Sequence, residues 1–248
     1  GYYLMLYSAK DTDKIFQMVM GWDVDGVIAI SFSKSNCEKI YQLINKPIVS
    51  IDAYGELDAG QESHVLNIGL DDESGGYLMT KYLLECGYEH IQVCAGRDNG
   101  VDHLRYMGAQ RAAREFAGKK QKVQFTALGM NYAKRKESYA WLIQRKKPKT
   151  ALFFLSDLYA LEAISFFSSR GVKIPEEIGI AGYDNISYAE FSVPRLTTVS
   201  QNVEQKASLA VEILMERING EDKERENEIR LPVTLISRKS VQRQDEKK

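Results

Sequence analysis

Short apolar runs alternate with amphipathic stretches along almost the whole of this 248-residue chain. The apolar runs have the length and β-branched content of buried strands, and the amphipathic stretches have helical spacing. Strands that alternate with helices in this way predict parallel sheets covered by helices. Because the two halves share the pattern, we expect an α/β fold of two lobes. Each lobe should be a parallel, doubly wound sheet flanked by helices, and several crossovers should join the lobes at a hinge.

The same pattern gives approximate limits for the elements. Strands are expected at residues 2–7, 24–30, 47–51, 64–70, 91–95, 123–128, 150–155 and 178–181, with extended pieces at 196–199 and 229–237. Helices are expected at residues 12–20, 36–44, 71–86, 102–117, 134–144, 157–169 and 203–218.

Composition excludes several classes of protein. A net charge of −1 gives the chain as a whole no electrostatic footprint for nucleic acid. No apolar run reaches the roughly 18 residues that a membrane span needs, so we expect no membrane partner. Cys37, Cys86 and Cys94 are odd in number and lack metal-ligand spacing. Free thiols in a reducing, cytoplasmic compartment are the simpler interpretation of these three residues.

Polar side chains follow the predicted strands at the ends where open α/β sheets bind ligands. Asp184 is the most informative, since it ends a buried strand in a Gly-Tyr-Asp-Asn turn. A carboxylate and a guanidinium that face one pocket can grip neighbouring hydroxyl groups of a ligand. Each residue also has a structural alternative: helix capping for the acids and the serine, an ion pair for the arginine, core packing for the tyrosine. The candidate ligand-binding residues are Asp71, Asn99, Arg105, Tyr132, Ser156 and Asp184.

Enzyme chemistry finds no support in the sequence. His64, His90 and His103 lack the spacing of a zinc site, and no nucleophile motif or dinucleotide-binding motif is present. Gly75 and Gly76 at a predicted helix start could hold a phosphate, but two glycines there more often allow close packing of a helix on a sheet. We therefore expect no catalysis, no metal and no cofactor.

Several ordered motifs resemble the effector-binding domain of the lactose/galactose repressor (LacI/GalR) family. The resemblance covers essentially the whole chain. Its clearest parts are Asp71-Asp-Glu-Ser-Gly-Gly76, Arg105-Tyr-Met-Gly108, Gly179-Ile-Ala-Gly-Tyr-Asp184 and Pro194-Arg-Leu-Thr-Thr-Val-Ser-Gln201. The resemblance implies a periplasmic-binding-protein-like fold with lobes at residues 1–98 and 99–201, a return to the first lobe at 202–232, and a last strand and tail at 233–248.

The resemblance also implies a function. It predicts the regulatory core of a cytoplasmic, homodimeric transcriptional repressor or activator that binds a small effector in a cleft between the lobes. In this family the effector is usually a sugar and sometimes a purine or a phosphosugar. Arg105 and Asp184 would be the principal polar contacts, and the other four candidates would line the same cleft. Operator DNA would be bound through an N-terminal helix-turn-helix outside this sequence. An extracytoplasmic sugar receptor of a transporter is the alternative with the same fold.

The sequence departs from the family pattern at three places. Ser156 stands where the family commonly has Asn, and Asp72 replaces the Asn of an Asp-Asn pair. The family's DNA-binding module, first strand and first helix have no counterpart before Gly1, so the first lobe is expected to lack an interior strand.

Overall fold

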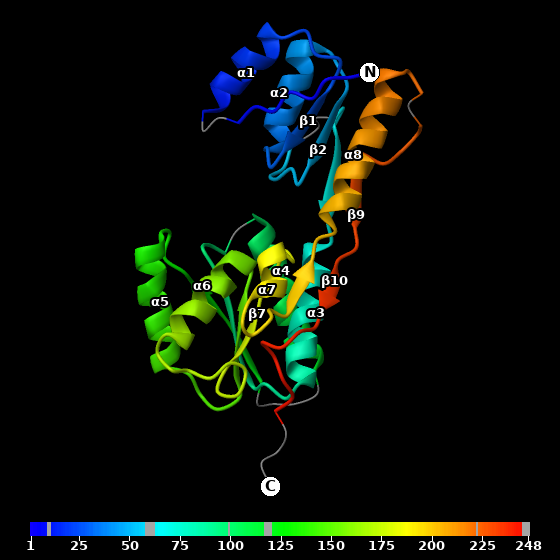
Figure 1. Ribbon diagram of the computed structural model, residues 1–248. Helices are drawn as coiled ribbons and strands as arrows, with labels where there is room; N and C mark the ends of the chain where they lie inside the picture. Colours follow the sequence, from blue (N-terminus) through cyan, green and yellow to red (C-terminus); the bar gives the residue numbers. More distant parts are fainter. Residues whose placement is uncertain (9–10, 58–62, 99, 117–120, 222, 245–248) are drawn as a thin grey trace. The chain divides into compact units, whose positions relative to one another are not determined.

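The chain folds into two compact units, each built from two separate stretches of sequence (Figure 1). The computed structural model describes residues 1–248 except 9–10, 58–62, 99, 117–120, 222 and 245–248. Unit 1 comprises residues 1–70 and 203–231, and unit 2 comprises residues 71–202 and 232–248. The predicted boundary at 98/99 is therefore corrected to 70/71. The physical reason is that the segment 71–98 supplies a helix and a strand to the second core.

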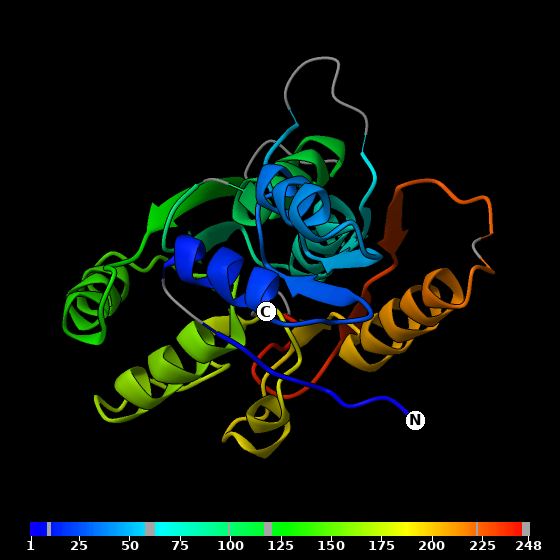
Figure 2. The same cartoon turned by 90° about the horizontal axis from the view of Figure 1, so that it is seen from above.

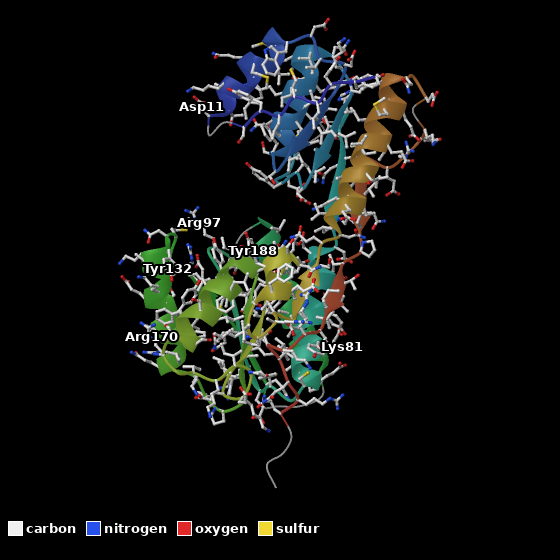
Figure 3. All side chains as sticks on the ribbon, in the orientation of Figure 1. Asp11, Lys81, Arg97, Tyr132, Arg170 and Tyr188 are labelled. Carbon is white, nitrogen blue, oxygen red and sulfur yellow. The ribbon has the colours of Figure 1, made fainter. Side chains whose placement is uncertain are left out.

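Unit 1 contains one parallel sheet of four strands in the order β1-β2-β3-β9. Apolar side chains of the strands and of α1 and α2 form its core, which includes Phe16, Val19, Ile40 and Ile48. Asp11 caps α1 by accepting a hydrogen bond from the Asp13 amide (Figure 3). The elements are α1 (Thr12–Gly21), β1 (Val27–Ile30), α2 (Lys34–Ile44), β2 (Ile48–Ile51), β3 (Leu66–Leu70), α8 (Val203–Ile218) and β9 (Glu228–Leu231).

The first predicted strand is not formed. Residues 2–7 lie outside the sheets and expose large apolar side chains, with Tyr3 at 99% and Leu4 at 91% exposure. A strand needs a neighbour to bond its backbone N–H and C=O groups, and among the described residues none pairs with this segment. The sequence pattern is that of a strand, yet the pattern alone does not supply the partner.

Unit 2 contains a second parallel sheet of four strands, in the order β5-β4-β6-β7. α3 and α4 cover one face of the sheet and α5 and α6 the other (Figures 1 and 2). Side chains alternate between the faces, so Leu152 and Phe154 join the core beneath α5 and α6. The elements are α3 (Asp72–Glu85), β4 (His90–Ala95), α4 (Gly100–Glu115), β5 (Lys122–Ala127), α5 (Tyr132–Gln144), β6 (Thr150–Phe154), α6 (Asp157–Ser168) and β7 (Gly179–Ala181).

Three further elements complete unit 2. The short helix α7 (Ser187–Phe191) lies between the predicted strand 178–181 and the predicted extended piece 196–199, where no helix was expected. β8 (Thr198–Ser200) and β10 (Thr234–Ile236) pair antiparallel, as a separate two-stranded sheet. β10 and β9 share the predicted extended piece 229–237, which Pro232 interrupts because proline cannot donate a backbone hydrogen bond. The tail after residue 231 therefore belongs to the second unit.

The structure also gives the state of the cysteines and the character of the helices. Cys37, Cys86 and Cys94 are buried free thiols. Among the residues that the structure describes, no helix combines the length and the apolar character needed to cross a membrane.

Candidate functional site

The turn after β7 places Asp184 at the carboxyl edge of the unit 2 sheet. Its backbone has a φ of 121°, which is rare for any residue with a side chain. The Asp184 N–H donates to the carbonyl of Val199 at 2.9 Å, which ties the turn to β8. Backbone strain of this kind persists where the surrounding structure enforces it, and it concentrates at functional sites.

The Asp184 carboxylate accepts several hydrogen bonds from other elements. Gln201 Nε2 donates to Oδ1 at 2.5 Å. Ser156 Oγ donates to Oδ2 at 3.2 Å, and the Asp157 amide approaches the same oxygen at 3.4 Å. Burial raises the pKa of Asp184, although Arg105 and these donors oppose the rise. The carboxylate is thus held in a fixed direction while it keeps part of its surface open to solvent.

Ser156 occupies the N-cap position of α6 without capping it. Its hydroxyl turns to Asp184 instead. The capping alternative for this residue is therefore wrong, and the serine acts as a support for the carboxylate.

Arg105 projects from α4 and is 7% exposed. Its Nε donates to Asp72 Oδ1 at 2.8 Å, and its Nη1 donates to the carbonyl of Leu155 at 2.9 Å. The guanidinium lies 3.7 Å from the ring centre of Tyr183. Burial by itself would lower the pKa of Arg105, but Asp72, Tyr183 and Asp184 raise it overall. The arginine stays charged and is oriented by three different segments of the chain.

Close packing of α3 against α4 determines where Arg105 lies. A Cβ atom on Gly76 would come within 1.8 Å of the carbonyl oxygen of Arg105, and one on Gly108 within 1.8 Å of that of Glu73. A Cβ atom on Gly75 would come within 2.2 Å of the Tyr183 hydroxyl. These glycines therefore serve packing: they let the helices touch, and they leave room for the tyrosine beside Asp72.

Two further carboxylates surround this group. Asp102 Oδ1 lies 3.7 Å from Arg105 Nη1. Burial raises the pKa of Asp102 to about 6, and the negative charges of Asp72 and Asp184 add to the rise against the effect of Arg105. Burial likewise raises the pKa of Asp157 to about 7, although hydrogen bonds from Thr198 and from the Ile186 amide stabilise its charge. One guanidinium thus lies among several acids.

The other predicted residues behave differently. Asp71 is the N-cap of α3 and accepts a hydrogen bond from the Ser74 amide at 3.0 Å. Tyr132 is the first residue of α5 and is 47% exposed, with Lys136 Nζ 5.1 Å from its ring centre (Figure 3). Asn99 lies outside the described residues. The structure therefore brings together Arg105, Ser156 and Asp184, and it gives Asp71 a capping role.

Sequence reasoning missed several members of the group. Asp72, which the sequence marked only as a departure from the family pattern, makes the contact with Arg105. Asp102 could have been found, since it lies one helical turn before Arg105. Asp157 and Gln201 gave no local signal, because the contacts that involve them join segments far apart in the sequence. Within the described ranges, no cluster of His, Cys, Asp or Glu is arranged to hold a metal ion.

The geometry defines the chemistry that this edge of unit 2 can offer. It presents an oriented carboxylate, a fixed guanidinium and a serine hydroxyl at the carboxyl ends of parallel strands. Such a set binds polar groups by charge-assisted hydrogen bonds. The fold and this arrangement define a ligand-binding domain, and residues 80–241 match the periplasmic binding protein-like domain.

Comparison with known proteins gives the family. The HTH-type transcriptional repressor PurR of Pasteurella multocida (strain Pm70) is 31% identical over 97% of this chain and 72% of its own length. The solved LacI family regulator of Enterococcus faecalis V583, with bound ribose, is 26% identical and has a TM-score of 0.77 over 93% of this chain and 82% of that one. A periplasmic binding protein/LacI transcriptional regulator of Alkaliphilus metalliredigens QYMF, complexed with D-xylulofuranose, is 27% identical and has a TM-score of 0.76 over 93% and 84%. The chain belongs to the LacI/GalR family and forms the ligand-binding regulatory core of such a regulator.

Proposed function

We propose that this regulatory core responds to a small polyhydroxylated effector, of the sugar class, and that Asp184 and Arg105 bind it. The observation that carries the proposal is the convergence of these two charged groups and Ser156 at the carboxyl ends of β6 and β7. Relatives of this family have been solved with ribose and with D-xylulofuranose. A ligand rich in hydroxyl groups suits an oriented carboxylate and guanidinium, because its hydroxyl groups both donate and accept hydrogen bonds.

Unused bonding capacity supports the choice of these two residues. Arg105 has five N–H donors, and its bonds to Asp72 and Leu155 engage two of them. Asp184 offers about four acceptor positions. Two of its bonds, at 3.2 and 3.4 Å, are long enough to be exchanged for shorter ones to a ligand. The site is therefore oriented in advance while it retains capacity for a ligand.

Regulators of this family bind effectors and DNA and form dimers. We place the operator contact outside residues 1–248, because a chain with a net charge of −1 has little attraction for phosphates. Regulation of transcription, without catalysis, in the cytoplasm fits relatives that are themselves transcriptional regulators. The transport-receptor alternative is not favoured.

A second copy of this chain is the partner that we propose for an apolar area on unit 2. Tyr188, Phe191 and Val193, on α7 and just after it, are 73%, 75% and 86% exposed. Three large apolar side chains within six residues are costly to leave in water and are typical of an interface. A closed dimer would bury the same patch on both copies.

Titration calorimetry against a panel of pentoses, hexoses and purines tests the effector proposal. Asp184→Asn keeps the size of the side chain and removes its charge. We expect Asp184→Asn to bind the sugar that the wild type binds about 10–100-fold more weakly, because the variant loses a hydrogen bond to a charged group. Glu176→Gln removes an exposed acid elsewhere in unit 2 and should bind normally. Equal affinity of wild type and Asp184→Asn would contradict the assignment of the site, and binding of a purine alone would contradict the ligand class.

A further inference from the structure

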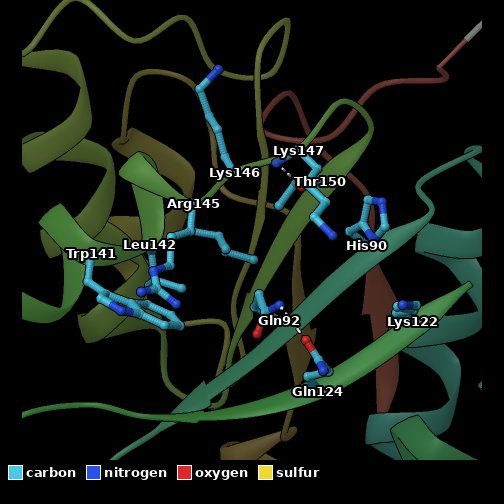
Figure 4. A pocket seen from close by; sticks show the side chains of 11 residues that line it. His90, Gln92, Lys122, Gln124, Trp141, Leu142, Arg145, Lys146, Lys147 and Thr150 are labelled. Atoms are coloured by element: carbon cyan, nitrogen blue, oxygen red, sulfur yellow. Dashed lines mark hydrogen bonds between the residues drawn. The ribbon is translucent and has the colours of Figure 1, made fainter.

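A pocket lies at the amino end of the unit 2 sheet, opposite the edge that carries Asp184 (Figure 4). The first residues of three neighbouring strands border it: His90 of β4, Lys122 of β5 and Thr150 of β6. Trp141 and Arg145, from α5 and its C-terminal end, form another wall. The cavity measures about 210 Å³. Because Asp184 follows a strand at its carboxyl end, this pocket is separate from the site described above.

The border of this pocket is strongly cationic. Lys122, Arg145 and Lys147 have no carboxylate partner among the described residues, whereas Lys146 pairs with Glu177 at 2.9 Å. No acidic side chain lines the pocket within the described part of the chain. Like charges gathered around one concave surface repel each other, and an anion placed among them relieves the repulsion. Most lysines on a protein surface are mixed with acids, so this arrangement is unusual for a chain of net charge −1.

The floor and wall add neutral contacts. Gln92 Nε2 donates to Gln124 Oε1 at 3.3 Å across the floor, and Thr126 donates to Gln92. These amides lie on the same face of β4 and β5, so the sheet surface below the lysines is polar. Trp141 is 43% exposed, with the Arg145 guanidinium 4.9 Å from its ring centre. A partly exposed indole can pack against the carbon skeleton of an organic ligand.

His90 reports the local potential. Burial lowers its pKa, and the positive charges of Lys147 and Lys122 lower it further. Glu89 acts in the opposite direction, but its carboxylate pairs with Lys149 at 2.8 Å. The field at the His90 ring is therefore net positive, which is the environment that attracts an anion.

From the convergence of Lys122, Arg145 and Lys147 on a pocket with an amide floor and an indole wall, we infer a second binding site, for a small organic phosphate. Phosphate oxygens accept charge-assisted hydrogen bonds from lysine and arginine, and the amides and Trp141 suit the attached carbon skeleton. The volume is below the roughly 300–1,000 Å³ of pockets for larger ligands. A compact phosphorylated metabolite fits it better than a dinucleotide.

Proton NMR of the histidine ring signals tests this site directly. The chain has three histidines, so a His90→Asn variant assigns the signal of interest. Inorganic phosphate and glycerol 3-phosphate are titrated in turn, with sodium chloride at equal ionic strength and glycerol as controls. We expect both phosphates to give a saturable shift of the His90 signal and to raise its pKa, because a bound anion stabilises the imidazolium form. Glycerol 3-phosphate should bind more tightly, since its skeleton also contacts Trp141.

Substitutions test whether phosphate binds in this pocket. The double variant Lys122→Gln, Lys147→Gln should bind phosphate about tenfold more weakly or worse, because it loses two charged contacts to the anion. Lys136→Gln removes an exposed cation from the same helix as Trp141 and should bind as the wild type does. Thermal unfolding at an unchanged temperature shows that the double variant is folded. A His90 shift equal to that in chloride, or equal phosphate affinity in the double variant, would overturn the inference. Binding of inorganic phosphate without glycerol 3-phosphate would overturn the ligand class.

Discussion

Asp184 has a backbone conformation that favours glycine, so Asp184→Gly and Asp184→Ala should differ in stability although both remove the carboxylate. The φ of 121° brings the Cβ atom of any side chain into conflict with its own backbone. Both variants lose the same hydrogen bonds from Ser156 and Gln201. Their difference therefore isolates the backbone strain at this turn.

The magnitude follows from two opposing contributions. A residue with a Cβ atom at a sparsely populated φ costs about 1–3 kcal/mol, which glycine avoids. Glycine loses about 0.5–1 kcal/mol through the greater freedom of its unfolded chain. We expect Asp184→Gly to be the more stable variant by about 1 kcal/mol. For a chain of this size, that corresponds to a Tm higher by about 2–4 °C.

Differential scanning calorimetry of the two variants measures this difference. Glu212 on α8 is an exposed helical position and provides the matched control. There the order should reverse, because glycine is less stable than alanine in a helix by about 1 kcal/mol. If Asp184→Ala proved as stable as Asp184→Gly or more stable, the strain would not exist and the reasoning would be refuted. Both Asp184 variants should also lose affinity for the effector.

Two further outcomes are expected. The ordinary pKa of an aspartate is 3.8, and that of Asp157 in the folded protein is raised to about 7 by burial. Between these two pKa values, the native state keeps a proton on Asp157 that the unfolded chain has lost. The stability that this bound proton contributes disappears as the pH rises through about 7. In urea unfolding, the free energy of unfolding of Asp157→Asn should rise relative to that of wild type by about 2–3 kcal/mol between pH 5 and pH 8. If the difference between the two proteins stayed constant with pH, Asp157 would not be a buried, protonated acid. Phe191→Glu should convert a dimer to a monomer in sedimentation equilibrium, whereas a monomeric wild type or a dimeric variant would contradict the proposed interface.

The order and type of the elements were largely predictable from sequence. Helix α8 begins and ends at the predicted residues 203 and 218, because its apolar stripe has helical spacing and Asn219 and Gly220 end it. Residues 2–7 show the limit of this reasoning. Their apolar character is typical of a strand, but a strand forms only beside another strand, and periodicity carries no information about the neighbour.

The candidate site was predictable only in part. Asp184 and Arg105 stood out because polar residues after buried strands mark the ligand edge of an α/β sheet. Ser156 was a candidate for the same edge, with helix capping as its alternative, and the structure turns its hydroxyl to Asp184. The choice of Asp72 over Asp71 as the partner of Arg105 depends on the helical rotation of α3, which adjacent residues in a sequence do not reveal.

Fold class, family and most of the succession of elements could be derived from the amino-acid sequence, since these depend on periodicity and on motifs within short segments. Which acids surround Arg105, where the units divide, and the cationic pocket at the amino ends of three strands are consequences of tertiary packing. Tyr183 and Asp72 are 111 residues apart and yet share a hydrogen bond. Contacts of this kind arise from packing between elements, through glycines such as Gly76 and Gly108 that permit close approach. Local patterns fix what each segment becomes, and only the packed chain fixes which side chains meet.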